Sequence, residues 1–317
     1  MADLTVVVDP GGTGDYLTLT AAEAGEQSAH HDLVGDGNSI FFNCVSGLDA
    51  NVCSFSGWHA NADHKITIST SLANRHTGKR GSGFRLVVDA AWGSVFECLI
   101  PYTTIDGLSF TNTSEYARYV TLNGWGTAGY MILKNCFITT NGNFGQGSMV
   151  QITGAVSSKV INNIIVGTAF GVVTEACDPF YAYNNTFLNC GVGMSCDGWV
   201  NFYAKNNYAG ASVTADYTAR DEATYWHGTT NYGSDETLDS SLMSVADCHF
   251  VNSTLNSEDG AISAGSGLIG IGTDLRADAI YNVTTDIFGT TRAAVPCVGA
   301  YEYVAPVISF IPIVIII

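Results

Sequence analysis

The chain has 317 residues, of which 46% are hydrophobic and only 13% are charged, and its formal net charge is −17. Such an acidic surface repels phosphate groups, which argues against nucleic-acid binding. The high glycine count (35 residues) and the weak helical periodicity favour an all-β protein with many tight turns.

The nine cysteines show no CxxC pair and no metal-finger spacing. Several lie in apolar runs, as Cys98 and Cys136 do, so we predict buried thiols in a reducing compartment. A bridge between Cys190 and Cys196 stays open as an alternative. The seven histidines show no ligand spacing either, and we expect no metal and no cofactor.

The N-terminal region begins with a strand-like run at residues 4–8, followed by a Gly-rich turn. Thr20, with Glu23 three residues later, predicts the start of a short helix that covers the open end of the fold. The first residues lack the basic and long apolar stretches of a signal peptide. We therefore expect a protein made in a cytoplasm and kept there until assembly.

Strand candidates follow at residues 39–45, 65–70, 84–89 and 95–100, and a repeat then dominates the chain. Short apolar runs recur around Gly107, Asn135, Asn163, Asn185 and Asn207, which are spaced by 28, 28, 22 and 22 residues. This spacing suits one coil of three short strands and three turns, with asparagines stacked at one turn. The sequence predicts a single-stranded right-handed parallel β-helix, with a β-sandwich as the alternative.

The C-terminal part is less regular. Residues 213–248 are predicted to form a loop-rich excursion. The runs 249–252, 260–274, 286–292 (Asp-x-x-Gly-x-x-Arg) and 298–303 (ending Gly-Ala-Tyr-Glu-Tyr) resemble the final coil and ending of pectin-lyase-like β-helix proteins of microbes and phages. The opening strand and turn resemble the first coil of the same superfamily. The predicted organisation is a cap at 1–27, a β-helix at 28–303 and a tail at 304–317.

The resemblance implies a fold and leaves activity open, because the same ending occurs in enzymes, adhesins and virion proteins. The carboxylate pair, arginine and glutamines of pectin methylesterases have no evident counterpart, and the likeness of 286–289 to a catalytic stretch of those enzymes is read as accidental. Lys134, Lys159 and Lys205 are expected to be solvated at strand edges. The chain is therefore predicted not to be an enzyme.

A carbohydrate-binding or depolymerising β-helix remains the alternative function. A glycosidase would need two carboxylates close together, and Glu175, Asp178 and Asp197 are the candidates. Aromatic side chains on successive coils could either fill the core or form a glycan platform on an outer face. The residues concerned are Trp125, Tyr181, Tyr183, Trp199, Tyr203 and Tyr208.

The last eleven residues form an extended hydrophobic tail that is too short to span a bilayer as a helix. Exposed, such a β-branched segment would aggregate, so it needs a surface that covers it. Its nine large apolar residues are the predicted assembly residues: Val307, Ile308, Phe310, Ile311, Ile313, Val314, Ile315, Ile316 and Ile317.

These features together lead to one functional expectation. We expect a virion structural protein, such as a capsid decoration, fibre or spike subunit of a phage. Its expected partners are further copies of itself in a homotrimer, or a capsid protein, with a host surface glycan as a further possibility. Folding of the tail back onto its own β-helix is the alternative to docking between chains.

Overall fold

The computed structural model describes residues 3–306 apart from internal gaps. These gaps are 90–92, 115–117, 125–128, 141–147, 168, 198–199, 213, 220–224, 236, 239 and 255–256. The predicted assembly tail, 307–317, lies outside the described residues.

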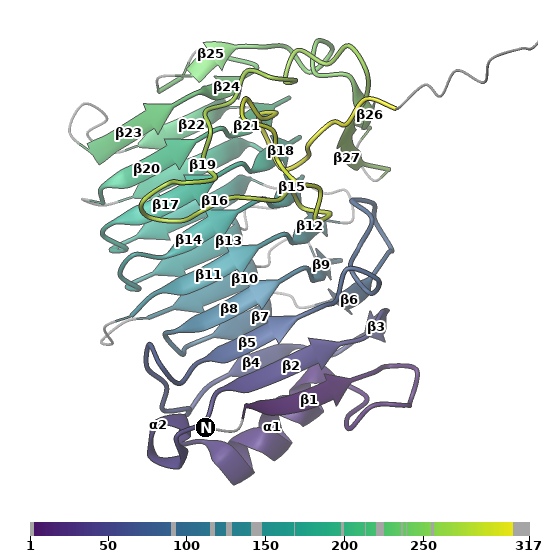
Figure 1. Ribbon diagram of the computed structural model, residues 1–317, viewed down its shortest axis with the longest axis vertical. Helices are drawn as coiled ribbons and strands as arrows, with labels where there is room; N and C mark the ends of the chain where they lie inside the picture. The colour runs from purple at the N-terminus through teal and green to yellow at the C-terminus, as the bar shows by residue number, and fades with distance from the viewer. Residues whose placement is uncertain are drawn as a thin grey trace, which may run out of the picture.

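Three parallel sheets run the length of the molecule, and the chain visits them in the same order in every coil (Figure 1). Each strand pairs with its counterparts one coil before and one coil after, so successive coils stack at about 4.8 Å. This is the predicted right-handed parallel β-helix.

The first sheet, sheet 1, consists of β1 (Leu4–Val8), β2 (Ile40–Cys44), β5 (Ile66–Ser69), β8 (Thr103–Asp106), β11 (Met131–Lys134), β14 (Lys159–Ile161), β17 (Phe180–Tyr183), β20 (Phe202–Lys205) and β23 (Trp226–Thr229). Sheet 2 consists of β3 (Gly47–Asp49), β6 (Phe84–Val88), β9 (Ser109–Asn112), β12 (Phe137–Thr140), β15 (Ile164–Val166), β18 (Thr186–Leu188), β21 (Tyr208–Gly210), β24 (Asn231–Gly233) and β25 (Ser240–Leu242). Sheet 3 consists of β4 (Cys53–Phe55), β7 (Ser94–Cys98), β10 (Arg118–Asn123), β13 (Ser148–Thr153), β16 (Phe170–Glu175), β19 (Val192–Asp197) and β22 (Ala215–Ala219).

The predicted strands of residues 39–100 are therefore present as β2, β5, β6 and β7. The region 213–248 is more regular than predicted, because it supplies four strands to the stack, β22 to β25. Alternate residues of the strands point inward and form the main core, which contains seven of the nine cysteines. Cys248 and Cys297 belong to the cluster beneath the strap, and all nine are buried as free thiols. Buried thiols are what the sequence predicts.

The turn between sheets 1 and 2 contains two kinds of asparagine, and the predicted alignment mixed them. Residues with left-handed backbone angles align as Gly107, Asn135, Asn162, Asn184 and Asn206, so the coils are 28, 27, 22 and 22 residues long. The next residue in each later coil points inward instead. These inward asparagines form a hydrogen-bonded ladder of Asn163, Asn185, Asn207 and Asn231.

The N-terminal end is covered by helix α1 (Leu19–His30), followed by the short α2 (Leu33–Asp36) (Figure 1). Leu19 and Ala22 insert into the core. The N-cap is Thr18, whose hydroxyl accepts from the amide of Ala21, and not Thr20 as predicted. Glu23 accepts instead from Ser56 and Trp58, so its role is to attach the helix to the first coil.

The C-terminal part does not form a final coil, in contrast to the prediction. Strands β26 (Phe250–Asn252) and β27 (Asp259–Ile262) pair antiparallel outside the stack. Residues 263–303, called the strap below, then fold back along the rod (Figure 1). The strap buries Leu268 and Val298 against the outer face of sheet 2, and Leu275 and Val283 against sheet 1.

Buried polar side chains attach the strap to the coils. The Arg292 guanidinium donates to the Asn162 side chain at 2.9 Å and forms an ion pair with Glu302 at 3.3 Å. Asp286 accepts from the amides of Phe288 and Glu302. The ending that carries the family resemblance is therefore a structural anchor in this chain, and Asp286 of the stretch 286–289 takes part in that anchor.

Candidate functional site

A column of aromatic and basic side chains lies on the outer face of sheet 1. Lys159, Tyr181, Tyr203 and His227 are register partners on four consecutive strands, so their side chains follow one another along the rod. The rings of Tyr181 and Tyr203 are stacked with centroids 5.3 Å apart, and those of Tyr203 and His227 with centroids 4.7 Å apart. We call these four residues the outer strip.

At the N-terminal end of the outer strip, the Lys159 ammonium lies between two tyrosine rings. The Lys159 ammonium lies 5.5 Å from the Tyr181 centroid and 5.3 Å from that of Tyr130, and it donates to the Ser157 carbonyl. Only 8% of Lys159 is exposed, and burial lowers the pKa of its ammonium. Lys159 is therefore not solvated as predicted, because ring faces and a carbonyl have replaced much of its water.

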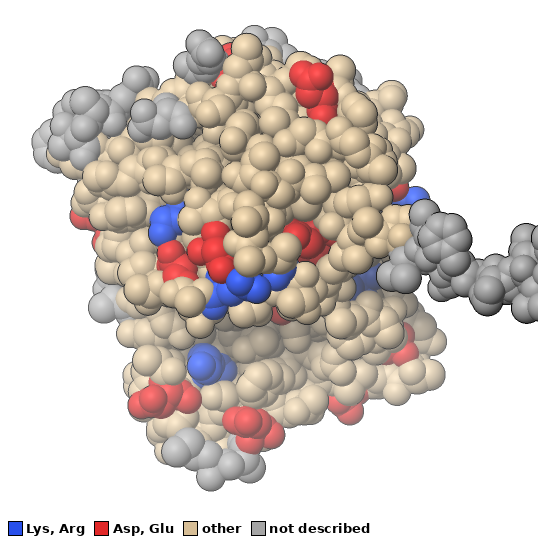
Figure 2. Space-filling view, turned by 45° about the horizontal axis from the view of Figure 1, so that its top comes forward, with Lys and Arg blue, Asp and Glu red and all other residues tan. Residues whose placement is uncertain are grey.

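The other two lysines of the middle coils are also paired. Lys134 forms an ion pair with Asp106 at 3.2 Å, and Lys205 with Asp278 of the strap at 2.7 Å. Figure 2 shows a mostly uncharged surface on which the basic side chains lie close to acidic ones, and further acidic side chains stand alone. This face therefore offers no extended basic patch for a polyanion.

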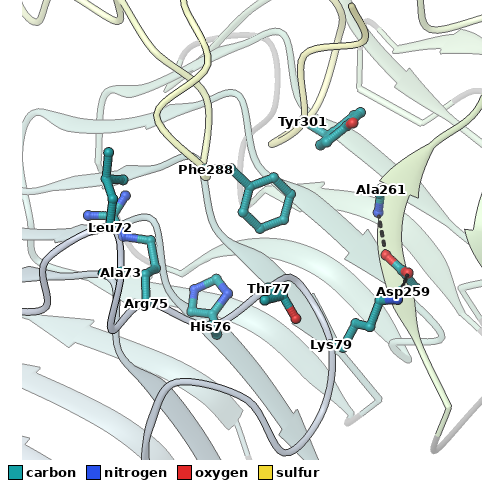
Figure 3. A pocket seen from close by; sticks show the side chains of 10 residues that line it. All are labelled: Leu72, Ala73, Arg75, His76, Thr77, Lys79, Asp259, Ala261, Phe288 and Tyr301. Carbon is teal, nitrogen blue, oxygen red and sulfur yellow. Dashed lines mark hydrogen bonds and ion pairs between the residues drawn. The ribbon is translucent and has the colours of Figure 1, made fainter. Parts of the chain in front are cut away.

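A pocket of about 520 Å³ opens between the loop that follows β5 and the C-terminal part of the chain. In Figure 3 the Phe288 ring lies at its centre, with Tyr301 and Ala261 on one side and Leu72 and Arg75 on the other. Residues far apart in sequence therefore form this pocket, and no sequence motif could have indicated it. We call this cavity the strap pocket. It is lined by Leu72, Ala73, Arg75, His76, Thr77, Lys79, Asp259, Ala261, Phe288 and Tyr301.

Most charged groups of the strap pocket already have partners. Arg75 donates to the Ile287 carbonyl and pairs with Asp106 at 2.8 Å, and Lys79 pairs with Asp259 at 3.0 Å. The polar groups thus attach the loop to the strap and to β27. What the pocket leaves for an occupant is mainly apolar surface.

His76 is the buried base of the strap pocket. One ring nitrogen lies 2.7 Å from the Asn135 carbonyl and the other accepts from the amide of Gly78, which requires a neutral ring. Burial lowers its pKa to about 4. At neutral pH this histidine is therefore an uncharged structural donor and acceptor.

The candidate carboxylates lie on and next to sheet 3. Glu175 and Asp197 are register partners on β16 and β19, and the Glu175 side chain is exposed. Asp178 is already used, since it accepts from both the amide and the side chain of Asn201. The structure therefore brings together the backbones of Glu175 and Asp197, and assigns Asp178 to a turn.

The predicted aromatic residues divide into three groups. Tyr181 and Tyr203 belong to the outer strip, where Tyr181 is buried in the same cluster as Tyr183 and the strap, and Tyr203 is half-buried. Tyr183 and Tyr208 are buried beneath the strap and its neighbours. Trp125 and Trp199 lie outside the described residues. His227, which completes the strip, was missed because only the register of β20 with β23 reveals it.

Among the described residues there is no group of three or more histidine, cysteine or acidic side chains that could hold a metal ion. Within the same residues, none of the helices has the length and apolar character needed to cross a membrane.

No protein-family model matches the chain, and no curated protein matches it. Among solved structures, it is similar to a pectin methylesterase from Aspergillus niger (TM-score 0.40, 10% identity, 76% of this chain and 89% of that chain covered). It is also similar to the pectate lyase Pel9A (TM-score 0.31, 13% identity, 95% and 96% covered). The chain is a right-handed parallel β-helix protein. The three stacked parallel sheets confirm the predicted fold, and the two similar structures transfer no residue role to this chain.

The expectation that the chain is not an enzyme is corrected by these comparisons, since both structures belong to enzymes. The expectation rested on the lack of a catalytic motif in the sequence. That inference is unsafe for a β-helix, because side chains of different coils form any site and no local motif has to mark it.

Proposed function

We propose that this β-helix binds a linear carbohydrate along the outer strip. The observation that carries the proposal is the in-register stacking of Tyr181, Tyr203 and His227 on an outer face. Tyr203 is half-buried and His227 is exposed, so these two rings offer edges and polar atoms to a ligand, whereas Tyr181 is buried and supports Tyr203 from the coil before. Burial raises the pKa of the Tyr181 phenol further above neutral pH.

The geometry suits a ligand that repeats along its length. Tyr203 and His227 present polar ring edges on two successive coils, which are about 4.8 Å apart. Sugar hydroxyls can accept from and donate to such a row, while C–H groups contact the ring edges. Since Lys205 is paired with Asp278 and Lys159 is buried between two rings, a neutral chain suits this surface better than a polyanion.

The test is a binding screen with the full chain against plant, algal and bacterial surface polysaccharides, followed by calorimetry. Tyr203→Ala is expected to weaken binding about tenfold, because it removes the central ring of the strip. Tyr232→Ala, a half-buried tyrosine on sheet 2, is the matched control and should bind as the wild type does. Equal losses for both variants, or no binding of any glycan, would refute the proposal.

Cleavage is tested in the same screen by measuring released reducing or unsaturated ends. Glu175 and Asp197 are the residues to change, because they are register partners on adjacent strands. If products form, Glu175→Gln and Asp197→Asn should each abolish them while binding at the outer strip persists. Products that form undiminished in both variants would exclude this pair.

A second proposal concerns assembly and rests on the sequence of residues 307–317. Nine of these eleven residues are large and apolar, and burial of each contributes roughly 1.5–3 kcal/mol. We propose that the tail attaches the chain to another chain in a virion, as a capsid decoration, fibre or spike subunit. Removal of 307–317 should leave a folded rod that no longer assembles, as judged by light scattering; unchanged assembly would refute this role.

A further inference from the structure

The strap pocket and the hydrophobic tail are complementary in chemistry. The charged groups of the pocket are engaged with one another, as described above, and Leu72 at its edge is 62% exposed. Water in contact with Leu72 and Phe288 would be released by an apolar occupant. A sugar would find few uncommitted polar partners here, so the pocket favours aliphatic side chains.

The tail begins six residues after Tyr301, which lines this pocket. Tyr303 still packs against the sheet 2 cluster. Val304, Ala305 and Pro306 are then all exposed, and Figure 1 shows this segment leaving the body past β26. The described chain thus ends in three exposed, uncharged residues, directly before the apolar residues 307–317 of the sequence.

We propose that the strap pocket of one copy receives apolar side chains from residues 307–317 of a second copy. A pocket of about 520 Å³ holds only a few of the nine large side chains. The remaining side chains need a surface between two bodies, which a neighbouring copy supplies and a fold-back onto a single rod does not. The inference rests on the second proposal above, since both require the tail to be bound by another chain.

Salt should strengthen this contact. Each copy carries a net charge of −17, so two copies repel each other at low ionic strength. The tail contributes no charged side chain, so screening removes repulsion without weakening an attraction. Self-association is therefore expected to increase between low and physiological salt, in contrast to an assembly held by ion pairs.

The pocket is tested by sedimentation of the full chain with Ala73→Glu, which places a carboxylate at an exposed position in the pocket. This variant is expected to weaken self-association at least tenfold. Ala277→Glu makes the same change at an exposed position of the strap outside the pocket and should assemble as the wild type does. A monomeric wild-type chain, or Ala73→Glu that assembles normally, would overturn the inference.

The occupant is tested by cross-linking. Leu72→Cys in one tagged chain and Ile313→Cys in an untagged chain are expected to form a disulfide between the two chains on mild oxidation. If a chain carrying both changes forms only an internal link, the tail folds back and the inference fails. Should deletion of 307–317 abolish assembly while both pocket experiments fail, the assembly role would stand and only its binding site would be wrong.

Discussion

The stack of coils and the strap are held in place by different means. In the stack, each coil repeats the backbone hydrogen bonds and the inward side chains of the coil before it, and the asparagine ladder continues through four coils. The strap has no strand partner in the stack, and it depends on individual contacts such as Arg292 with Asn162. Periodic structure distributes its stability over many equivalent bonds, whereas the strap depends on individual apolar contacts and a few buried polar groups.

The largest effect is expected from breaking the anchor of the strap. Arg292→Met leaves Glu302 and the Asn162 side chain buried without their cationic partner, which should cost about 3–5 kcal/mol. Hydrogen exchange should show the loss first in residues 263–303, with the coils still protected. Arg276→Met removes an exposed ion pair with Asp274 and should leave protection unchanged. Equal exchange in both variants would mean that the anchor does not hold the strap.

Two adjacent asparagines of one coil have different roles: the Asn185 side chain belongs to the hydrogen-bonded ladder, and Asn184 provides a left-handed backbone angle. Asn185 makes four side-chain hydrogen bonds in the ladder, so Asn185→Ala should destabilise the protein by about 3 kcal/mol. Asn184 is equally buried but its side chain has no hydrogen-bond partner among the described residues, and its φ is 55°. Asn184→Gly retains that backbone freedom and should change stability by less than about 0.5 kcal/mol. Denaturant unfolding measures both, and similar losses would contradict the assigned roles.

The stability of the contact between the loop that follows β5 and the coils should fall in acid, because His76 of this loop is buried against the Asn135 carbonyl. Its pKa is about 4 when folded, against an ordinary value of 6.5, so the unfolded chain takes up the proton first as pH falls. This histidine stabilises the fold above pH 6.5 and that contribution declines below it, by about 2 kcal/mol at pH 5.

The corresponding measurement is unfolding at pH 8 and pH 5. His76→Gln should lose less stability over this range than the wild type, and His227→Gln controls for the same substitution at an exposed position. Identical pH dependence of His76→Gln and the wild type would show that His76 does not titrate in this window.

The smallest effect is expected for the thiols of the stack. All nine cysteines are buried, and burial raises the pKa of Cys98 to about 11 and of Cys136 to about 12. The native chain should therefore react negligibly with a thiol reagent over an hour, and unfolding in denaturant should release nine reactive thiols. Rapid reaction of the native chain would show that the coils open locally.

The stack could be predicted from the sequence because its signal is repeated. Spacing of the Asn-centred runs was enough for the fold and nearly enough for the register, although Asn162 and Asn163 could not be told apart without seeing which one points inward. The cap helix was also predictable, with an error of two residues at its N-cap.

The strap and the candidate sites could not be predicted in the same way. The runs 249–252 and 260–274 resemble a final coil in sequence, yet their conformation is set by what they pack against. The strap pocket combines Leu72 with Phe288, and the outer strip depends on the register of four strands. Such groupings are properties of the assembled rod and have no local sequence signal.

The strap also limits how many coils the rod can have beneath it. It bonds to Asn162 in one coil, to Thr186 in the next and to Asn206 in the one after that, through residues at fixed positions along its own length. Duplication of one 22-residue coil would preserve every pairing within the rod but shift these attachment points by a full rung. Whole repeats can therefore be added only before or after the coils that the strap contacts, and not between Asn162 and Asn206.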